Sequence, residues 1–119
     1  MKKIWIPIFT EEYGVNVFFG KRDEVKRALA KYTTYSLKTI DRDFGGRGCC
    51  FNCYPDSAPI MAIDGDLKVS VAMATIAHEA CHAVDYLMEY VGIDDRSGEF
   101  RAHGVASIMR KVLAQISKS

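Results

Sequence analysis

The chain has 119 residues, enough for a hydrophobic core, and we expect residues 1–119 to form a single domain. Its 16 Lys and Arg residues and 15 Asp and Glu residues give a formal net charge of +1 without a long run of either sign. This balance indicates neither a nucleic-acid partner nor a membrane surface. No stretch of about 18 uncharged apolar residues is present and no signal-peptide cleavage site is recognised, so a cytoplasmic protein is expected.

The first half of the chain predicts strands around one helix. Residues 3–9 and 13–19 are rich in β-branched and aromatic side chains and are separated by a short polar turn, which is typical of a strand pair. Apolar residues at helical spacing over 25–32 predict an amphipathic helix of about three turns. Residues 34–40 return to period two, and with residues 49–54 they predict a hairpin or a loop.

A short apolar segment, 59–64, ends in an Asp-Gly-Asp turn and predicts a brief strand. Because Pro59 has no N–H to donate to a neighbouring strand, we expect this strand to lie at a sheet edge. Together with the later helices, these elements predict an α+β domain: a short mixed sheet, an N-terminal helix and two C-terminal helices.

Residues 67–91 are apolar around nearly the whole helical circumference, which predicts a long buried helix. Four polar side chains interrupt it on one ridge: His78, His82, Asp85 and Glu89. Burying such a ridge without partners would cost several kcal/mol. A bound metal ion with its water would satisfy it, so the surroundings favour metal binding.

The ridge contains an H-E-x-x-H motif, His78-Glu79-Ala80-Cys81-His82. Residues i and i+4 of a helix lie on one face, one turn apart, so both imidazoles can bind a single Zn²⁺ ion. Glu79 projects slightly to the side, where its carboxylate can reach a metal-activated water as general base. The motif therefore predicts one zinc ion per chain, used for metal-assisted hydrolysis.

A catalytic zinc ion usually has a third protein ligand. Glu99 is the first candidate, because it begins the next predicted helix and the small residues Ala102 and Ala106 would allow that helix to approach closely. His103, one turn later, is the second candidate and could alternatively stabilise an oxyanion. Asp85 could ligate as well, but it is better suited to accept a hydrogen bond from a zinc-bound imidazole.

The last helix carries apolar residues at helical spacing between 105 and 116, and this stripe predicts core packing. Near the middle of the chain, Cys50 and Cys53 form a lone C-x-x-C with Cys49 beside them. A structural zinc site would need further ligands that no second C-x-x-C supplies. We therefore interpret these cysteines as reduced thiols of a loop, although their role stays open.

The motif and the following Gly98-Glu99-Phe100-Arg101-Ala102 segment resemble the gluzincin branch of zinc metallopeptidases in a compact form. They also resemble small uncharacterised metallopeptidase-like proteins of phages and prophages, and the resemblance covers residues 59 to about 107. It implies a zincin-like fold, zinc on His78, His82 and Glu99, and Glu79 as catalytic base.

The same resemblance implies that a substrate backbone pairs with the strand around residues 61–63, and that the protein works in a bacterial cell or a phage-infected host. Larger gluzincins have an aspartate where this chain has His103, so Asp85 would take over the support of a zinc ligand. The predicted function is hydrolysis of a peptide or protein substrate. The alternative is a non-catalytic module that binds zinc or another protein.

Overall fold

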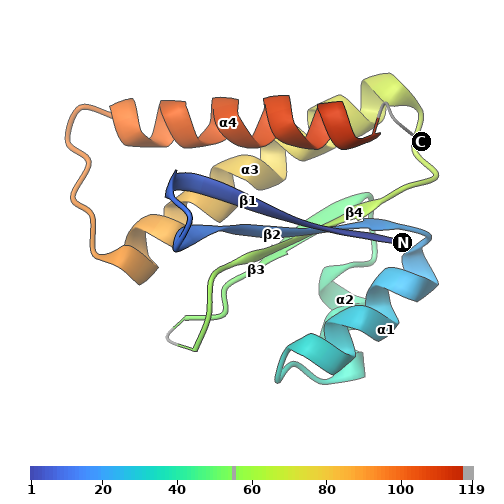
Figure 1. The fold of residues 1–119 in the computed structure, drawn as a ribbon. Coiled ribbons are helices and arrows are strands. Elements are labelled where there is room, and N and C mark those ends of the chain that lie inside the picture. The colour runs from blue at the N-terminus through green and yellow to red at the C-terminus, as the bar shows by residue number, and fades with distance from the viewer. Residues whose placement is uncertain (55, 117–119) are drawn as a thin grey trace.

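The computed structural model describes residues 1–54 and 56–116, in which a mixed four-stranded sheet carries two helices on each face (Figure 1). Strand order is β1-β2-β4-β3. The strands, in chain order, are β1 (Lys2–Thr10), β2 (Tyr13–Gly20), β3 (Gly48–Phe51) and β4 (Ile60–Asp64). The helices are α1 (Arg22–Tyr32), α2 (Leu37–Asp43), α3 (Val69–Val91) and α4 (Glu99–Ile116). The predicted α+β class and the two long C-terminal helices are confirmed.

The core has two parts, one on each face of the sheet. Side chains of β1, β2 and β4 pack against α3 and α4 on one face, and alternate side chains of β2, β3 and β4 pack against α1 and α2 on the other. This division follows from strand geometry, since successive side chains point to opposite faces. The predicted stripe on the last helix is confirmed as core, with Ile108 and Val112 fully buried.

The segment 34–40 does not form the predicted hairpin or loop, because Ser36 begins a helix. Its hydroxyl accepts a hydrogen bond from the Thr39 N–H at 3.2 Å, which caps the first turn of α2. Ile40 is the side chain that this helix buries, whereas Leu37, one of the residues that suggested period two, is 58% exposed. The local capping interaction thus outweighs a weak alternation.

The strand 60–64 is not an edge strand, because β4 pairs with β2 on one side and with β3 on the other. Pro59 precedes the paired residues of β4, and its carbonyl accepts a hydrogen bond from the Asn16 N–H. The sheet therefore loses no hydrogen bond because Pro59 lacks an N–H. The edge beside α3 is β3, which pairs only with β4 among the described strands.

The edge strand β3 lies close against α3 through Gly48. A Cβ atom at this position would come within 2.7 Å of Thr75 Cγ2, so only glycine allows this approach. We expect Gly48→Ala to destabilise the protein by about 1–3 kcal/mol, the usual cost of overpacking. Urea unfolding would measure this loss, and Thr75→Ser, which removes the opposing methyl group, should restore part of it in the double variant. Equal losses in the single and double variants would contradict the contact.

Candidate metal site

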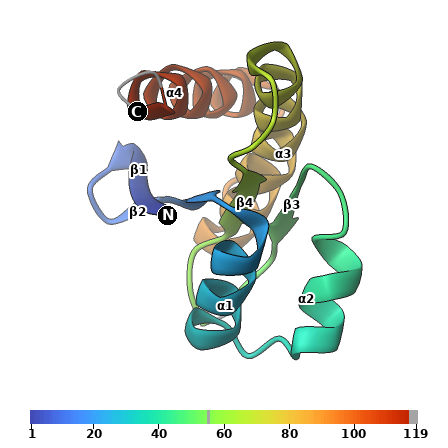
Figure 2. The ribbon, with the colours of Figure 1, turned by 90° about the vertical axis from the view of Figure 1, so that its right-hand side faces the viewer.

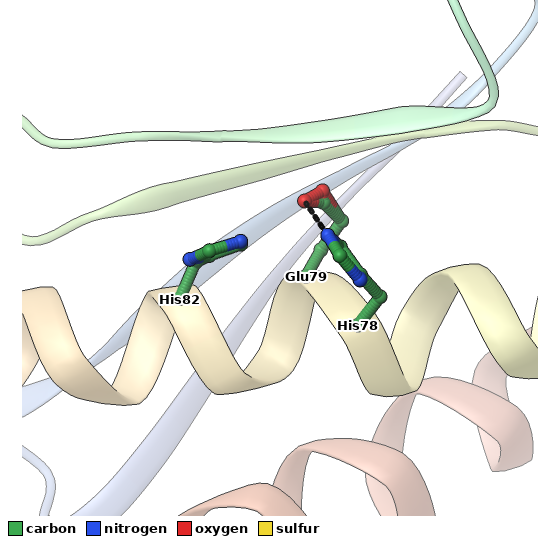
Figure 3. Close-up of side chains that lie close together, drawn as sticks. All are labelled: His78, Glu79 and His82. Carbon is green, nitrogen blue, oxygen red and sulfur yellow. Dashed lines mark ion pairs between the residues drawn. The ribbon is translucent and has the colours of Figure 1, made fainter.

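His78, Glu79 and His82 of the H-E-x-x-H motif lie together on α3, below β3 (Figure 3). One ligand atom each of His78, Glu79 and His82 lies within 4.8 Å of the others, and this is the only such group of His, Cys, Asp or Glu in the described part of the chain. The two imidazole centroids are 5.0 Å apart, and His78 Nε2 is 4.0 Å from Glu79 Oε1. Ligand atoms of a tetrahedral zinc ion lie roughly 3.4 Å apart, so small side-chain rotations would bring the two imidazole nitrogens onto one ion.

Burial divides the three residues into two kinds. The imidazole of His78 is 73% exposed and His82 is also exposed, whereas Glu79 is 5% exposed. Burial raises the pKa of the Glu79 carboxyl group, and the two neighbouring imidazoles oppose this rise. The site therefore combines two accessible nitrogen ligands with one buried carboxylate of increased basicity.

The predicted burial of the whole polar ridge is wrong. His78, His82, Asp85 and Glu89 are all exposed, because the sheet and α4 cover α3 on two sides and leave the third open. The free-energy argument for a metal from a buried ridge consequently does not apply to these four side chains. Within the described part of α3, Glu79 is the ionisable side chain that is buried.

The structure does not bring Glu99 to the group. Gly104 of α4 lies against Val84, where an added Cβ would come within 2.9 Å of Val84 Cγ2. Glu99 is the first residue of α4, and among the described residues it is not part of the group of ligand atoms on α3. Glu99 is also exposed, and α4 lies on the side of α3 away from the imidazoles (Figure 3).

The close approach between the helices does not occur at the predicted alanines. Ala102 and Ala106 are exposed, and Gly104 and Ser107 are the small residues that face the core. The sequence prediction placed the helix contact at alanines and did not include Gly104, although glycine permits the shortest distance between two helices.

The two remaining candidates also lie outside the group. Asp85 binds Arg101 through two hydrogen bonds of 2.8 and 3.4 Å from the guanidinium group, so its carboxylate is bound to α4 and not to an imidazole. His103 is exposed on α4 and is not part of the ligand group. Among the described residues, the ligand atoms that lie close enough together to share an ion are thus those of the motif itself.

We expect Glu99→Ala to retain zinc at the wild-type level, because Glu99 is not part of the ligand group formed by His78, Glu79 and His82. Elemental analysis of protein purified without chelators would measure the zinc content per chain. If Glu99 were the third zinc ligand, as the sequence predicts, this variant would lose zinc. A loss of zinc in this variant would show that α4 shifts when the ion binds.

A pocket and an aromatic ring complete the surroundings of the group. A pocket of about 420 Å³ lies beside His78 and Glu79, between Gly46–Gly48 and Ala74–Thr75. On the other side, the ring of Tyr86 stacks on that of His82, with centroids 6.3 Å apart. The i, i+4 spacing of these two residues carried the signal for this contact, since such residues are neighbours on a helix.

The cysteines of the middle segment are free thiols in the structure. Cys49 is buried on the α1 side of the sheet, and Cys50 packs on the α3 side. Burial raises the pKa of Cys50 and of Cys53, so both remain protonated at neutral pH. The metal-ligand group contains none of them.

The chain matches no protein-family model, no curated protein and no solved structure. In the described residues, none of the helices combines the length and the apolar character needed to cross a membrane.

Proposed function

We propose that this protein is a zinc-dependent peptidase of a minimal zincin-like type. The observation that carries the proposal is the juxtaposition of two exposed imidazoles and one buried carboxylate on α3. Two neutral imidazoles suit a borderline-soft divalent ion. When bound, zinc lowers the pKa of water and polarises a carbonyl group.

The three residues have different roles in the proposed reaction. His78 and His82 hold the ion through their ring nitrogens. The Glu79 carboxylate accepts a proton from the attacking water and later passes it to the nitrogen of the leaving amine. Burial raises the pKa of Glu79, which makes its carboxylate a stronger proton acceptor than an exposed one. Burial also raises the pKa of Tyr86, so its phenol stays protonated beside His82 as a hydrogen-bond donor.

The edge strand β3 offers the substrate a backbone to pair with. The Asp64 N–H donates to the Arg47 carbonyl, and the antiparallel register continues with Cys49 opposite Ala62. Hydrogen-bonded pairs alternate along such a ladder, so the N–H and C=O groups of Gly48 and Cys50 point to the free edge. A peptide added there would lie over α3, next to the pocket beside His78.

The proposal is tested by incubating the zinc-loaded protein with a library of internally quenched peptides. Cleavage that stops with a chelator and returns with zinc supports it, and Glu79→Gln is the variant that separates catalysis from metal binding. A protein that binds zinc but cleaves no peptide would instead support the second candidate, a zinc-binding module without catalysis. That candidate is favoured by the composition of the ligand group, in which no described residue outside the H-E-x-x-H motif takes part.

A further inference from the structure

A second pocket lies on the opposite face of the sheet from the metal site, and its lining is aromatic and cationic. It measures about 410 Å³ and is lined by residues of β1, β2, β4, the end of α1 and the segment between β3 and β4: Lys3, Ile4, Trp5, Asn16, Phe18, Tyr32, Ser57 and Ile60. This volume and this mixture of rings with a few polar groups are typical of sites for small ligands. None of the residues that line this pocket takes part in the proposed peptide hydrolysis.

The pocket exists because α1 is too short to cover the sheet. In Figure 2 the β1–β2 hairpin extends past α1, whereas α4 lies on its other side. Lys3 pairs with Phe18, Trp5 with Asn16, and Asn16 with Ile60, so two rows of side chains cross the uncovered face.

Two large rings of this pocket are accessible. Trp5 is 40% exposed, and its indole N–H donates to the Glu11 carbonyl, which fixes the ring. Tyr32 is 52% exposed and stands edge-on to Phe18 at 5.9 Å between centroids. Exposed Trp and Tyr rings held in place are typical anchors for a partner.

The charge of the pocket is positive. Lys3 Nζ donates to the Tyr32 hydroxyl at 2.6 Å and lies 4.1 Å from the ring centroid, and Lys31 Nζ lies 5.7 Å from the same ring. The lining contains no Asp or Glu. An anion entering the pocket would accept a hydrogen bond from the Lys3 ammonium group.

The pocket also continues beyond Tyr32. A neighbouring pocket of about 410 Å³ shares Tyr32 and Ser57 with it and has a mainly polar lining that includes Thr33, Thr34 and Asn52. A ligand with its ring and carboxylate in the first pocket could extend a polar chain into the second. This arrangement fits the end of a peptide better than an isolated aromatic acid.

We propose that this pocket binds the C-terminal aromatic residue of a peptide, with the ring between Trp5 and Tyr32 and the α-carboxylate on Lys3. The site is a docking site, and its ligand need not be the substrate of the peptidase.

The emission of Trp5 reports on this pocket alone, because Trp5 is the only tryptophan in the chain. The probes are three hexapeptides, Gly-Ser-Gly-Ser-Gly-Phe as the free acid, the same peptide as its C-terminal amide, and its alanine-ended counterpart. We expect saturable quenching or enhancement with the free acid and at least about tenfold weaker binding of the amide, the effect of one charge-assisted hydrogen bond. The alanine-ended peptide should not saturate. N-acetyl-phenylalanine should bind more weakly than the hexapeptide.

Lys3→Gln should remove the difference between acid and amide. Lys38→Gln is the matched control, because it deletes the same charge from an exposed position on α2. Tyr32→Ala, followed by anisotropy of a labelled peptide, should weaken binding at least about tenfold. Equal binding of acid and amide, equal effects of the two lysine variants, or no saturation with the phenylalanine peptide would each overturn the proposal.

Discussion

Replacing His82 by alanine is expected to reduce zinc affinity by more than about 100-fold, beyond the 10–100-fold cost of losing an outer-shell partner. The structure leaves an ion few alternatives, since the only group of ligand atoms in the described residues is that of His78, Glu79 and His82. The imidazole of His82 is exposed, so its removal opens no cavity and should not unfold α3. Competition with a chromophoric chelator measures the affinity.

His103→Ala is the matched control for this change. It removes an exposed imidazole from α4 that lies outside the ligand group, and zinc affinity should stay at the wild-type value. The same variant tests His103 as a third ligand. Wild-type affinity in His82→Ala, or an equal loss in His103→Ala, would show that the ion is held elsewhere.

Replacing Glu79 by glutamine is expected to retain zinc and to reduce peptide cleavage by about 10²- to 10⁴-fold, the usual contribution of a general base. Glutamine keeps the shape of the side chain but cannot accept the proton of the attacking water. The rates of the zinc-loaded proteins on one cleaved library peptide, together with zinc content, measure both parts. Glu89→Gln, an exposed carboxylate farther along the same ridge, is the control that should leave the rate unchanged.

The stability of the metal-free Glu79→Gln variant checks that a lost rate is not a lost fold. Because burial raises the native pKa of Glu79 above its ordinary value, the native state binds more protons than the unfolded state at pH values above that ordinary value. This carboxyl group therefore makes the wild type less stable as the pH rises through the raised pKa. Glutamine does not ionise and so avoids this loss of folding stability. Chelator-treated Glu79→Gln should therefore unfold at a higher temperature than wild type at neutral pH. A full rate in the zinc-loaded variant would exclude Glu79 as the base.

The sequence identified the candidate metal site because the information for it is local. His78 and His82 are separated by one helical turn, so the helix alone places both imidazoles on one face. The same local spacing brings Tyr86 onto His82. The apolar stripe of α4 and the capping Ser36 of α2 are also local signals. The alternation of apolar and polar residues over 34–40 nevertheless favoured a strand over the helix that Ser36 caps.

The choice of edge strand could not be read from the sequence. Pro59 suggested an edge position for the strand 60–64, yet the long-range parallel pairing of β2 with β4 placed it inside the sheet. That pairing left the short strand β3 at the edge beside α3. Which strand reaches an edge depends on contacts between residues far apart in the chain, and a single proline constrains only its own hydrogen bond.

The sequence by itself determined the α+β class, the two long C-terminal helices and the pairing of His78 with His82, because helical periodicity is a property of a few consecutive residues. Only the tertiary structure decided what lies around that pair. Gly104 of α4 packs on Val84 of α3, Glu99 lies outside the ligand group of the described residues, and Glu79 is buried whereas both imidazoles are exposed. These results depend on how two helices and a sheet fit together, and close packing of side chains from distant segments fixes that fit.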